Sequence, residues 1–136
     1  MKKIVSLIMI FVLICSFSCN LSAATIENEI MPMWTNIYSV STYINFGGTK
    51  GTATASITGE DGTERISATL AIYVQNSNGG WTYITHTGTY TNDERLILSV
   101  DFSGESGKYY KAVLNTVVTI DGVEESTTKT SYKTCS

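Results

Sequence analysis

The stretch from Ile66 to Val74 constrains the fold more than any other part of the chain. Every second position in it is apolar: Ile66, Ala68, Leu70, Ile72 and Val74. A period of two is typical of a β-strand with one buried and one solvated face. The polar and glycine residues 76–80 follow, and then the aromatic and β-branched run 81–87. The sequence therefore predicts a β-hairpin whose strands are residues 66–75 and 81–87.

Similar patterns on both sides of this hairpin predict further strands. They are expected at residues 40–46, 52–58, 96–100, 108–120 and 123–132. Residues 88–94 are polar and are predicted to form a loop, whereas Asp121-Gly122 favours a two-residue hairpin turn. The last strand is rich in charged and hydroxyl side chains, which is typical of a sheet edge. About seven antiparallel strands with regular turn signals predict an all-β sandwich, with a small closed barrel as the competing architecture.

The first 24 residues have the features of a secretory signal peptide. Lys2 and Lys3 precede the almost unbroken apolar run 4–17, and Ser22-Ala23-Ala24 supplies small residues before a cut after Ala24. We therefore expect a secreted, extracellular protein without membrane contact after cleavage. An uncleaved anchor is the alternative, although the apolar run is shorter than the roughly 20 residues of a membrane span. Lipid attachment at Cys19 is a second alternative.

The predicted domain organisation follows from the signal peptide. Residues 25–34 are an acidic leader with the only proline, and residues 35–136 form the sandwich domain. Of the three cysteines, only Cys135 lies beyond the predicted cut, so the domain cannot contain an internal disulfide. Because Cys135 is next to the last residue, we expect either an inert thiol on a loose tail or a thiol that bridges to a second chain.

Composition excludes several classes of function. The net charge is −3 and two of the nine basic residues lie in the signal peptide, so no basic cluster is left to bind nucleic acid. The only histidine, His86, is expected to face the opposite side from Trp81 and Tyr83, and no Gly-x-Ser-x-Gly motif occurs. A catalytic triad requires several such partners. We therefore name no catalytic residue and expect no cofactor.

The acidic residues offer two weaker alternatives. Glu60, Asp61 and Glu64 crowd one turn, and oxygen ligands on a loop suit calcium, but the Asp-x-Asp-x-Asp pattern is missing. Solvated turns are the simpler interpretation. Together with His86, the acidic loops also leave open a small secreted hydrolase, because two carboxylates at a suitable separation can cleave a glycosidic bond.

The aromatic residues of the central hairpin are the best candidates for binding. If Ile84 faces the core, Trp81 and Tyr83 face outward on the same surface as Tyr73. Exposed Trp and Tyr rings can stack on sugars or anchor a protein partner, although cross-strand stabilisation of the sheet would also explain them. The binding hypothesis requires Trp81 to face outward and not to cover Ala53 and Ala55.

Two resemblances add to this interpretation. The segment Gly107–Ala112 resembles the penultimate strand of an immunoglobulin-like domain, which implies a single immunoglobulin-like β-sandwich with Tyr110 as its corner tyrosine. The stretch from Trp34 to Ser131 resembles a family of small secreted β-rich proteins of unknown function from Gram-positive bacteria. Its motifs are 51–55 (Gly-Thr-Ala-Thr-Ala), 66–70 (Ile-Ser-Ala-Thr-Leu), 79–81 (Gly-Gly-Trp), 107–110 (Gly-Lys-Tyr-Tyr) and 121–124 (Asp-Gly-Val-Glu).

These observations favour a secreted, non-catalytic module that binds a protein or a glycan at the cell surface. The small hydrolase is one alternative. A structural or toxin-like protein that forms homo-oligomers through the polar edge 123–132 or through Cys135 is another.

Overall fold

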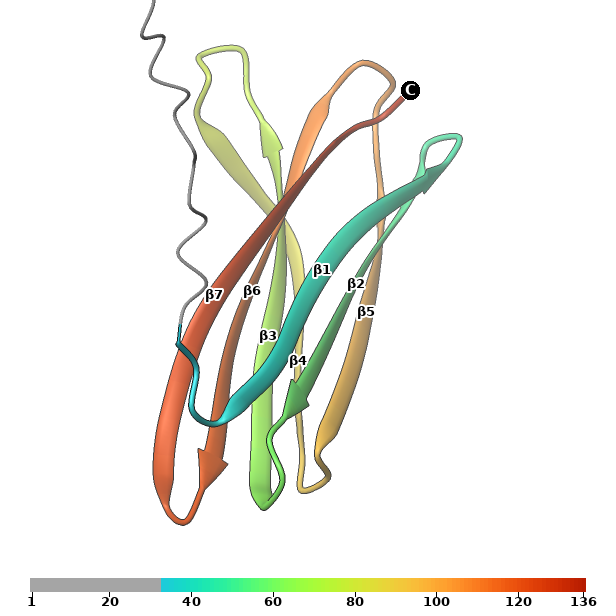
Figure 1. Ribbon diagram of the computed structural model, residues 1–136. Helices are drawn as coiled ribbons and strands as arrows, with labels where there is room; N and C mark the ends of the chain where they lie inside the picture. The colour runs from blue at the N-terminus through green and yellow to red at the C-terminus, as the bar shows by residue number, and fades with distance from the viewer. Residues whose placement is uncertain (1–32) are drawn as a thin grey trace, which may run out of the picture. The chain divides into compact units, whose positions relative to one another are not determined.

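A computed structural model describes residues 33–136 (Figure 1). The predicted signal peptide and residues 25–32 of the predicted leader lie outside the described residues. Residues 33–136 contain no helical segment with the length and hydropathy of a transmembrane span. Trp34 is half-buried and packs against the hydrophobic core, immediately before the first strand.

Seven antiparallel strands form two sheets (Figure 1). One sheet has three strands in the order β1-β2-β5, and the other has four in the order β4-β3-β6-β7. The prediction of an all-β sandwich is confirmed. The strands are β1 (Ile37–Gly47), β2 (Lys50–Gly59), β3 (Thr63–Gln75), β4 (Trp81–Thr91), β5 (Arg95–Ser103), β6 (Tyr109–Ile120) and β7 (Val123–Thr134).

The core lies between the sheets and is built from the alternate apolar positions. β2 contributes two alanines and an isoleucine, and β3 and β6 contribute longer aliphatic side chains. Because these side chains are removed from water on one face of each strand, the burial confirms the period of two. The most completely buried members are Ala53, Ala55, Ile57, Ile66, Leu70, Ile72, Ala112, Leu114, Val118 and Cys135.

The strand order is immunoglobulin-like, with one difference from the constant-type arrangement. In that arrangement the fourth strand belongs to the sheet of the first, second and fifth strands. Here β4 pairs with β3 instead, so the four-stranded sheet contains the whole central hairpin. The sheet that carries the aromatic residues is therefore the wider of the two.

Tyr110 forms the predicted tyrosine corner. Its side chain is 2% exposed, and its hydroxyl oxygen accepts a hydrogen bond of 2.8 Å from the backbone N–H of Glu105. Glu105 lies in the connection between β5 and β6, and Tyr110 is the second residue of β6. This contact fixes the loop against the core at the position expected from the resemblance.

The prediction of a loop at residues 88–94 is wrong for its first half. β4 continues to Thr91, because β3 is long enough to supply backbone partners: Gly88 pairs with Thr69, and Thr91 with Ile66. The polar composition of this segment reflects its place on an edge strand with a solvated face. Within this segment Gly88 and Tyr90, which lie opposite Thr69 and Ser67, belong to the face on which the aromatic residues lie.

The edges of the two sheets meet where β1 lies beside β7 (Figure 1). At the start of β1, the carboxylate of Glu125 in β7 accepts hydrogen bonds from the backbone N–H groups of Thr35, Asn36 and Ile37, the shortest of 2.7 Å. Three donors on one carboxylate are typical of a strong, charge-assisted contact. Glu125 thus ties the beginning of the domain to its last strand.

Cys135 follows β7 and lies at the other end of the region where β1 lies beside β7. Its side chain is 0% exposed, its Sγ lies 3.5 Å from the carbonyl oxygen of Gly48, and its backbone N–H donates to the carbonyl oxygen of Lys108 at 2.9 Å. The expectation of a thiol on a loose tail therefore needs correction. The intermolecular thiol does not fit this arrangement either, because a bridge to a second chain requires an accessible sulfur atom.

Candidate functional site

The candidate site is the outer face of the four-stranded sheet, where one row of large side chains crosses all four strands. Tyr73 of β3 lies opposite Tyr83 of β4 on one side and opposite Lys111 of β6 on the other. Lys111 in turn lies opposite Tyr132 of β7. Directly opposite residues on one face are within contact distance, so the register itself assembles this row.

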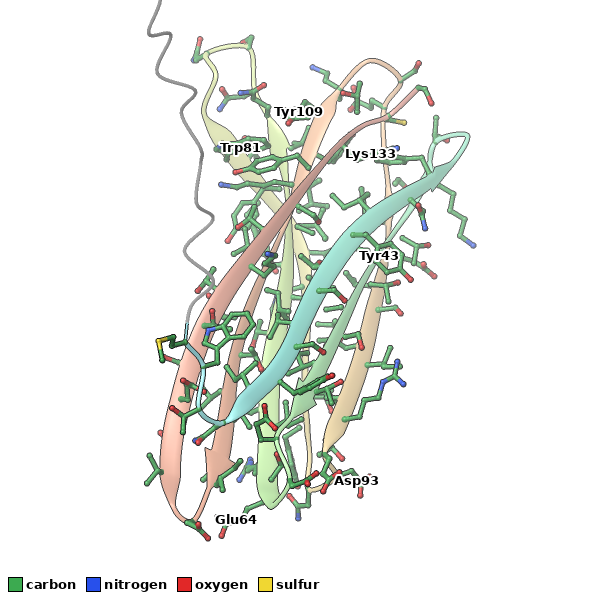
Figure 2. All side chains as sticks on the ribbon, viewed as in Figure 1. Tyr43, Glu64, Trp81, Asp93, Tyr109 and Lys133 are labelled. Atoms are coloured by element: carbon green, nitrogen blue, oxygen red, sulfur yellow. The ribbon has the colours of Figure 1, made fainter. Side chains whose placement is uncertain are left out.

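Trp81, Tyr109 and Tyr132 form an aromatic cluster at this end of the face. Each pair of rings has its centroids 5.7–5.9 Å apart, and Tyr109 and Tyr132 are stacked with an interplanar angle of 14°. Figure 2 shows the side chains of Trp81 and Tyr109 close together, near the start of β4 and β6. The prediction that Trp81 faces outward holds, and Trp81 does not cover Ala53 and Ala55.

Lys111 connects this cluster to the hairpin tyrosines. Its Nζ lies 4.5 Å from the centroid of the Trp81 ring and 5.1 Å from that of Tyr73. A cation held over two aromatic faces is attracted by their quadrupoles. Lys111 therefore fixes the positions of Trp81 and Tyr73 relative to each other.

A β-bulge in β4 brings His86 onto the same face. Ile72 pairs with Thr85 but Tyr73 pairs with Tyr83, so Ile84 is an extra residue without a partner in β3. The bulge reverses the alternation beyond it, and the Tyr83 hydroxyl is hydrogen-bonded to Nδ1 of His86. The prediction that His86 faces away from Trp81 and Tyr83 is wrong, because it assumed an unbroken period of two.

A hollow of about 630 Å³ lies farther along the same face. It exists because the outward positions here are small: Gly88 has no side chain, and the neighbouring position on β3 is Thr69. Thr69 lies opposite Asn115, and the Thr128 hydroxyl donates a hydrogen bond of 2.7 Å to Oδ1 of Asn115. Hydroxyl and amide groups thus line the floor of the hollow, together with the apolar side chain of Val117.

Arg65 and Tyr90 line the end of the hollow that is farther from the aromatic cluster. The guanidinium carbon of Arg65 lies 4.2 Å from the centroid of the Tyr90 ring. Of the residues that line the hollow, only Arg65 carries a charge. The face therefore has aromatic rings at both ends and a polar floor between them.

The structure brings together all three residues predicted for binding. Tyr73 and Tyr83 form an edge-to-face pair with centroids 5.9 Å apart, and Trp81 lies on the same face. Sequence reasoning missed Tyr109, Lys111 and Tyr132. A signal for them was present, since the two-residue turn at Asp121-Gly122 fixes the β6–β7 register and so places Lys111 opposite Tyr132.

The acidic residues considered as calcium ligands do not form a site. Glu60 and Asp61 lie in the turn between β2 and β3, and the Glu64 carboxylate accepts a hydrogen bond of 3.2 Å from the backbone N–H of Gly122. Figure 2 shows Glu64 at the end of the sandwich opposite to Trp81. Residues 33–136 contain no group of three or more His, Cys, Asp or Glu side chains arranged to hold a metal ion.

Comparison with known proteins gives no family. No protein-family model and no curated protein matches the sequence. Among solved structures, the β-glucuronidase of Parabacteroides merdae is 7% identical with a TM-score of 0.47, over 69% of this chain and 13% of the enzyme. CsgH of R. palustris is 19% identical with a TM-score of 0.40, over 66% of this chain and 90% of CsgH. Spo0M of Bacillus subtilis is 12% identical with a TM-score of 0.39, over 71% of this chain and 49% of Spo0M. These are distant likenesses to β-sandwich domains.

Proposed function

We propose that this protein is a secreted, non-catalytic module that binds a glycan on the outer face of its four-stranded sheet. The observation that carries the proposal is the hollow beside Thr69, Gly88 and Asn115, with Tyr90 at one end and hydroxyl and amide groups in its floor. The row of Tyr73 and Tyr83 lies on the same face, beyond the other end of the hollow. Sugars present hydroxyl groups at their edges and apolar C–H groups on their faces. A floor of hydroxyl and amide groups beside aromatic rings is complementary to both.

The floor of the hollow favours a glycan over a protein partner. Energetically dominant protein contacts are large side chains seated in dry, closely packed pockets. Thr69, Asn115 and Thr128 instead offer small polar groups on an open surface. The signal-peptide features of residues 1–24 support a place outside the cell, where such glycans occur.

The other candidate functions gain no support from the site. The acidic turn with Glu60 and Asp61 is at the opposite end of the sandwich from the aromatic cluster, and the His86 Nδ1 is already bonded to Tyr83. Assembly through β7 would have to occur at an edge that β1 already flanks. We therefore propose neither a hydrolase nor a protein that assembles through β7.

Filling the hollow tests the proposal. Gly88→Val places a branched side chain in the hollow, and the added Cβ lies 3.3 Å from Oγ1 of the exposed Thr69, whose hydroxyl can rotate away. Gly47→Val is the matched control, because a Cβ at Gly47 meets no atom within 4 Å and the residue belongs to the other sheet. Thermal unfolding should show both variants folded.

Binding is measured on immobilised xylan, cellulose, chitin, pectin, alginate and chondroitin sulfate. We expect the natural protein and Gly47→Val to bind at least one of these polysaccharides equally, and Gly88→Val to lose at least tenfold in affinity. Equal binding by Gly88→Val would overturn the placement of the site. Binding to none of the polysaccharides would overturn the proposed function.

A further inference from the structure

We infer that the glycan is acidic and that Arg65 binds its anionic group at the end of the hollow. This inference rests on the proposed function and specifies its ligand. The shared chemistry is a negatively charged group on a sugar, which a carboxylate of a uronic acid or a sulfate ester can supply. Arg65 is placed to receive either group, as its surroundings show.

Arg65 is the charged side chain of the hollow, and Tyr90 holds it in position. The guanidinium carbon lies 4.2 Å from the centroid of the Tyr90 ring. A guanidinium stacked on an aromatic face keeps the N–H donors along its edge available, and these match two oxygens of a carboxylate or sulfate. Restraint by the ring also reduces the rotamer entropy that Arg65 would lose on binding.

The placement of the charges around the hollow favours an anion. By register, the paired outward positions of the four strands include two cations, Arg65 and Lys111, and one carboxylate, Glu124. A second carboxylate, Glu64, belongs to the bulge before Arg65 and accepts a hydrogen bond from the backbone N–H of Gly122, outside the residues that line the hollow. Glu124 lies opposite Thr119, which lies opposite Arg65, so two strand spacings, about 10 Å, separate Glu124 from Arg65. Tyr90 is on the other side of β3 and holds the guanidinium away from Glu124. The lining of the hollow thus carries one positive charge, Arg65, in a chain whose net charge is −3.

The second cation extends the inference from a single sugar to a polymer. Lys111 lies opposite Tyr73, eight residues along β3 from Arg65, which corresponds to about 26 Å. The hollow begins at Arg65 and reaches the level of Thr69 and Asn115, about halfway to Lys111. A single acidic sugar in the hollow reaches Arg65 alone, whereas an extended acidic polysaccharide that follows β3 reaches both.

The test compares polysaccharides that differ in charge and share a backbone. Polygalacturonate is paired with its neutral methyl ester, and dextran sulfate with dextran. The variants are Arg65→Gln, Arg65→Lys and, as the matched control, Arg95→Gln, which removes the same charge from the exposed start of β5 in the other sheet. Affinity is measured at two NaCl concentrations, because a charge-dependent contact weakens with ionic strength.

We expect the protein to bind the charged member of at least one pair at least tenfold more tightly than the neutral member. Arg65→Gln should lose at least tenfold in affinity, Arg65→Lys should lose less, and Arg95→Gln should be unchanged. Binding of polygalacturonate alone or of dextran sulfate alone would support the inference and identify the anion. Equal affinity for charged and neutral members would overturn the inference and leave the proposed function standing. Equal losses in Arg65→Gln and Arg95→Gln would also overturn it. Failure to bind any of the four polymers, together with the wider panel, would overturn the proposed function.

Discussion

The Tyr83 hydroxyl is hydrogen-bonded to Nδ1 of His86, although the two residues are three positions apart on one strand. In a regular strand, residues with this separation face opposite sides of the sheet. The extra residue Ile84 changes the alternation, so that both side chains lie on the outer face. The bulge therefore places the protein's only histidine beside the tyrosines of the candidate site.

A double-mutant cycle tests this arrangement. Tyr83→Phe removes the hydroxyl and His86→Ala removes its partner, so the second change should cost less once the first has been made. We expect a coupling of about 0.5–1 kcal/mol in the free energy of unfolding, since both residues are partly solvated. Strictly additive effects in urea denaturation would contradict the bulge.

The tyrosine corner predicts that removing the hydroxyl of Tyr110 lowers the free energy of unfolding more than removing that of the adjacent Tyr109. Tyr110→Phe leaves the backbone N–H of Glu105 without its acceptor and should lower the free energy of unfolding by about 1–2 kcal/mol. Tyr109→Phe is the control, because the Tyr109 ring lies on the solvated face and stacks through its carbons. Chemical denaturation measures both, and similar values for the two variants would count against the corner.

The Glu125 carboxylate joins β7 to the start of β1, so replacing Glu125 should lower stability more than replacing its neighbour Glu124. Glu125→Ala removes the acceptor shared by the N–H groups of Thr35, Asn36 and Ile37, and we expect a loss of about 1–2 kcal/mol in stability. Hydrogen exchange at these amides should also accelerate. Glu124→Ala changes the neighbouring exposed carboxylate and should leave both quantities unaltered. Unchanged exchange in Glu125→Ala would refute this role.

The burial of Cys135 predicts a protected thiol. In the native protein, iodoacetamide should modify Cys135 at least tenfold more slowly than in denaturant, because the sulfur must first be exposed. Mass spectrometry of the C-terminal peptide measures the rate. Rapid native labelling, or a dimer linked through Cys135 on a non-reducing gel, would show that the last residues do not pack as described.

Much of the fold could be predicted because a strand with one buried face has apolar side chains at every second position, and this pattern is visible in the local sequence. The alternation from Ile66 to Val74 and the small residues Ala53 and Ala55 both identify inward faces correctly. The glycine and Asp-Gly turns separate the strands where expected. Tyr110 could be chosen as the corner residue because it shares a face with buried neighbours on β6.

The remaining features depend on contacts between distant parts of the chain. The continuation of β4 to Thr91 depends on the backbone partners that β3 supplies. The bulge at Ile84 depends on a register that one strand alone does not define. Cys135 is buried beside Gly48 and Gly104, which no local pattern connects to the C-terminus. The hollow depends on the register of four strands, so the sequence predicted only Tyr73, Trp81 and Tyr83, which lie on the same face outside the hollow.

The central claim is that an acidic glycan binds on the outer face of the four-stranded sheet, and backbone amide NMR tests it most directly. The protein is titrated with oligogalacturonate, and with sulfated dextran oligomers if the first has no effect. We predict that the largest chemical-shift changes occur in the floor and border of the hollow, at Arg65, Thr69, Gly88, Asn115 and Thr128, while β1, β2 and β5 are unaffected. Shift changes confined to the three-stranded sheet or to the acidic turns, or none with either oligosaccharide, would contradict the claim.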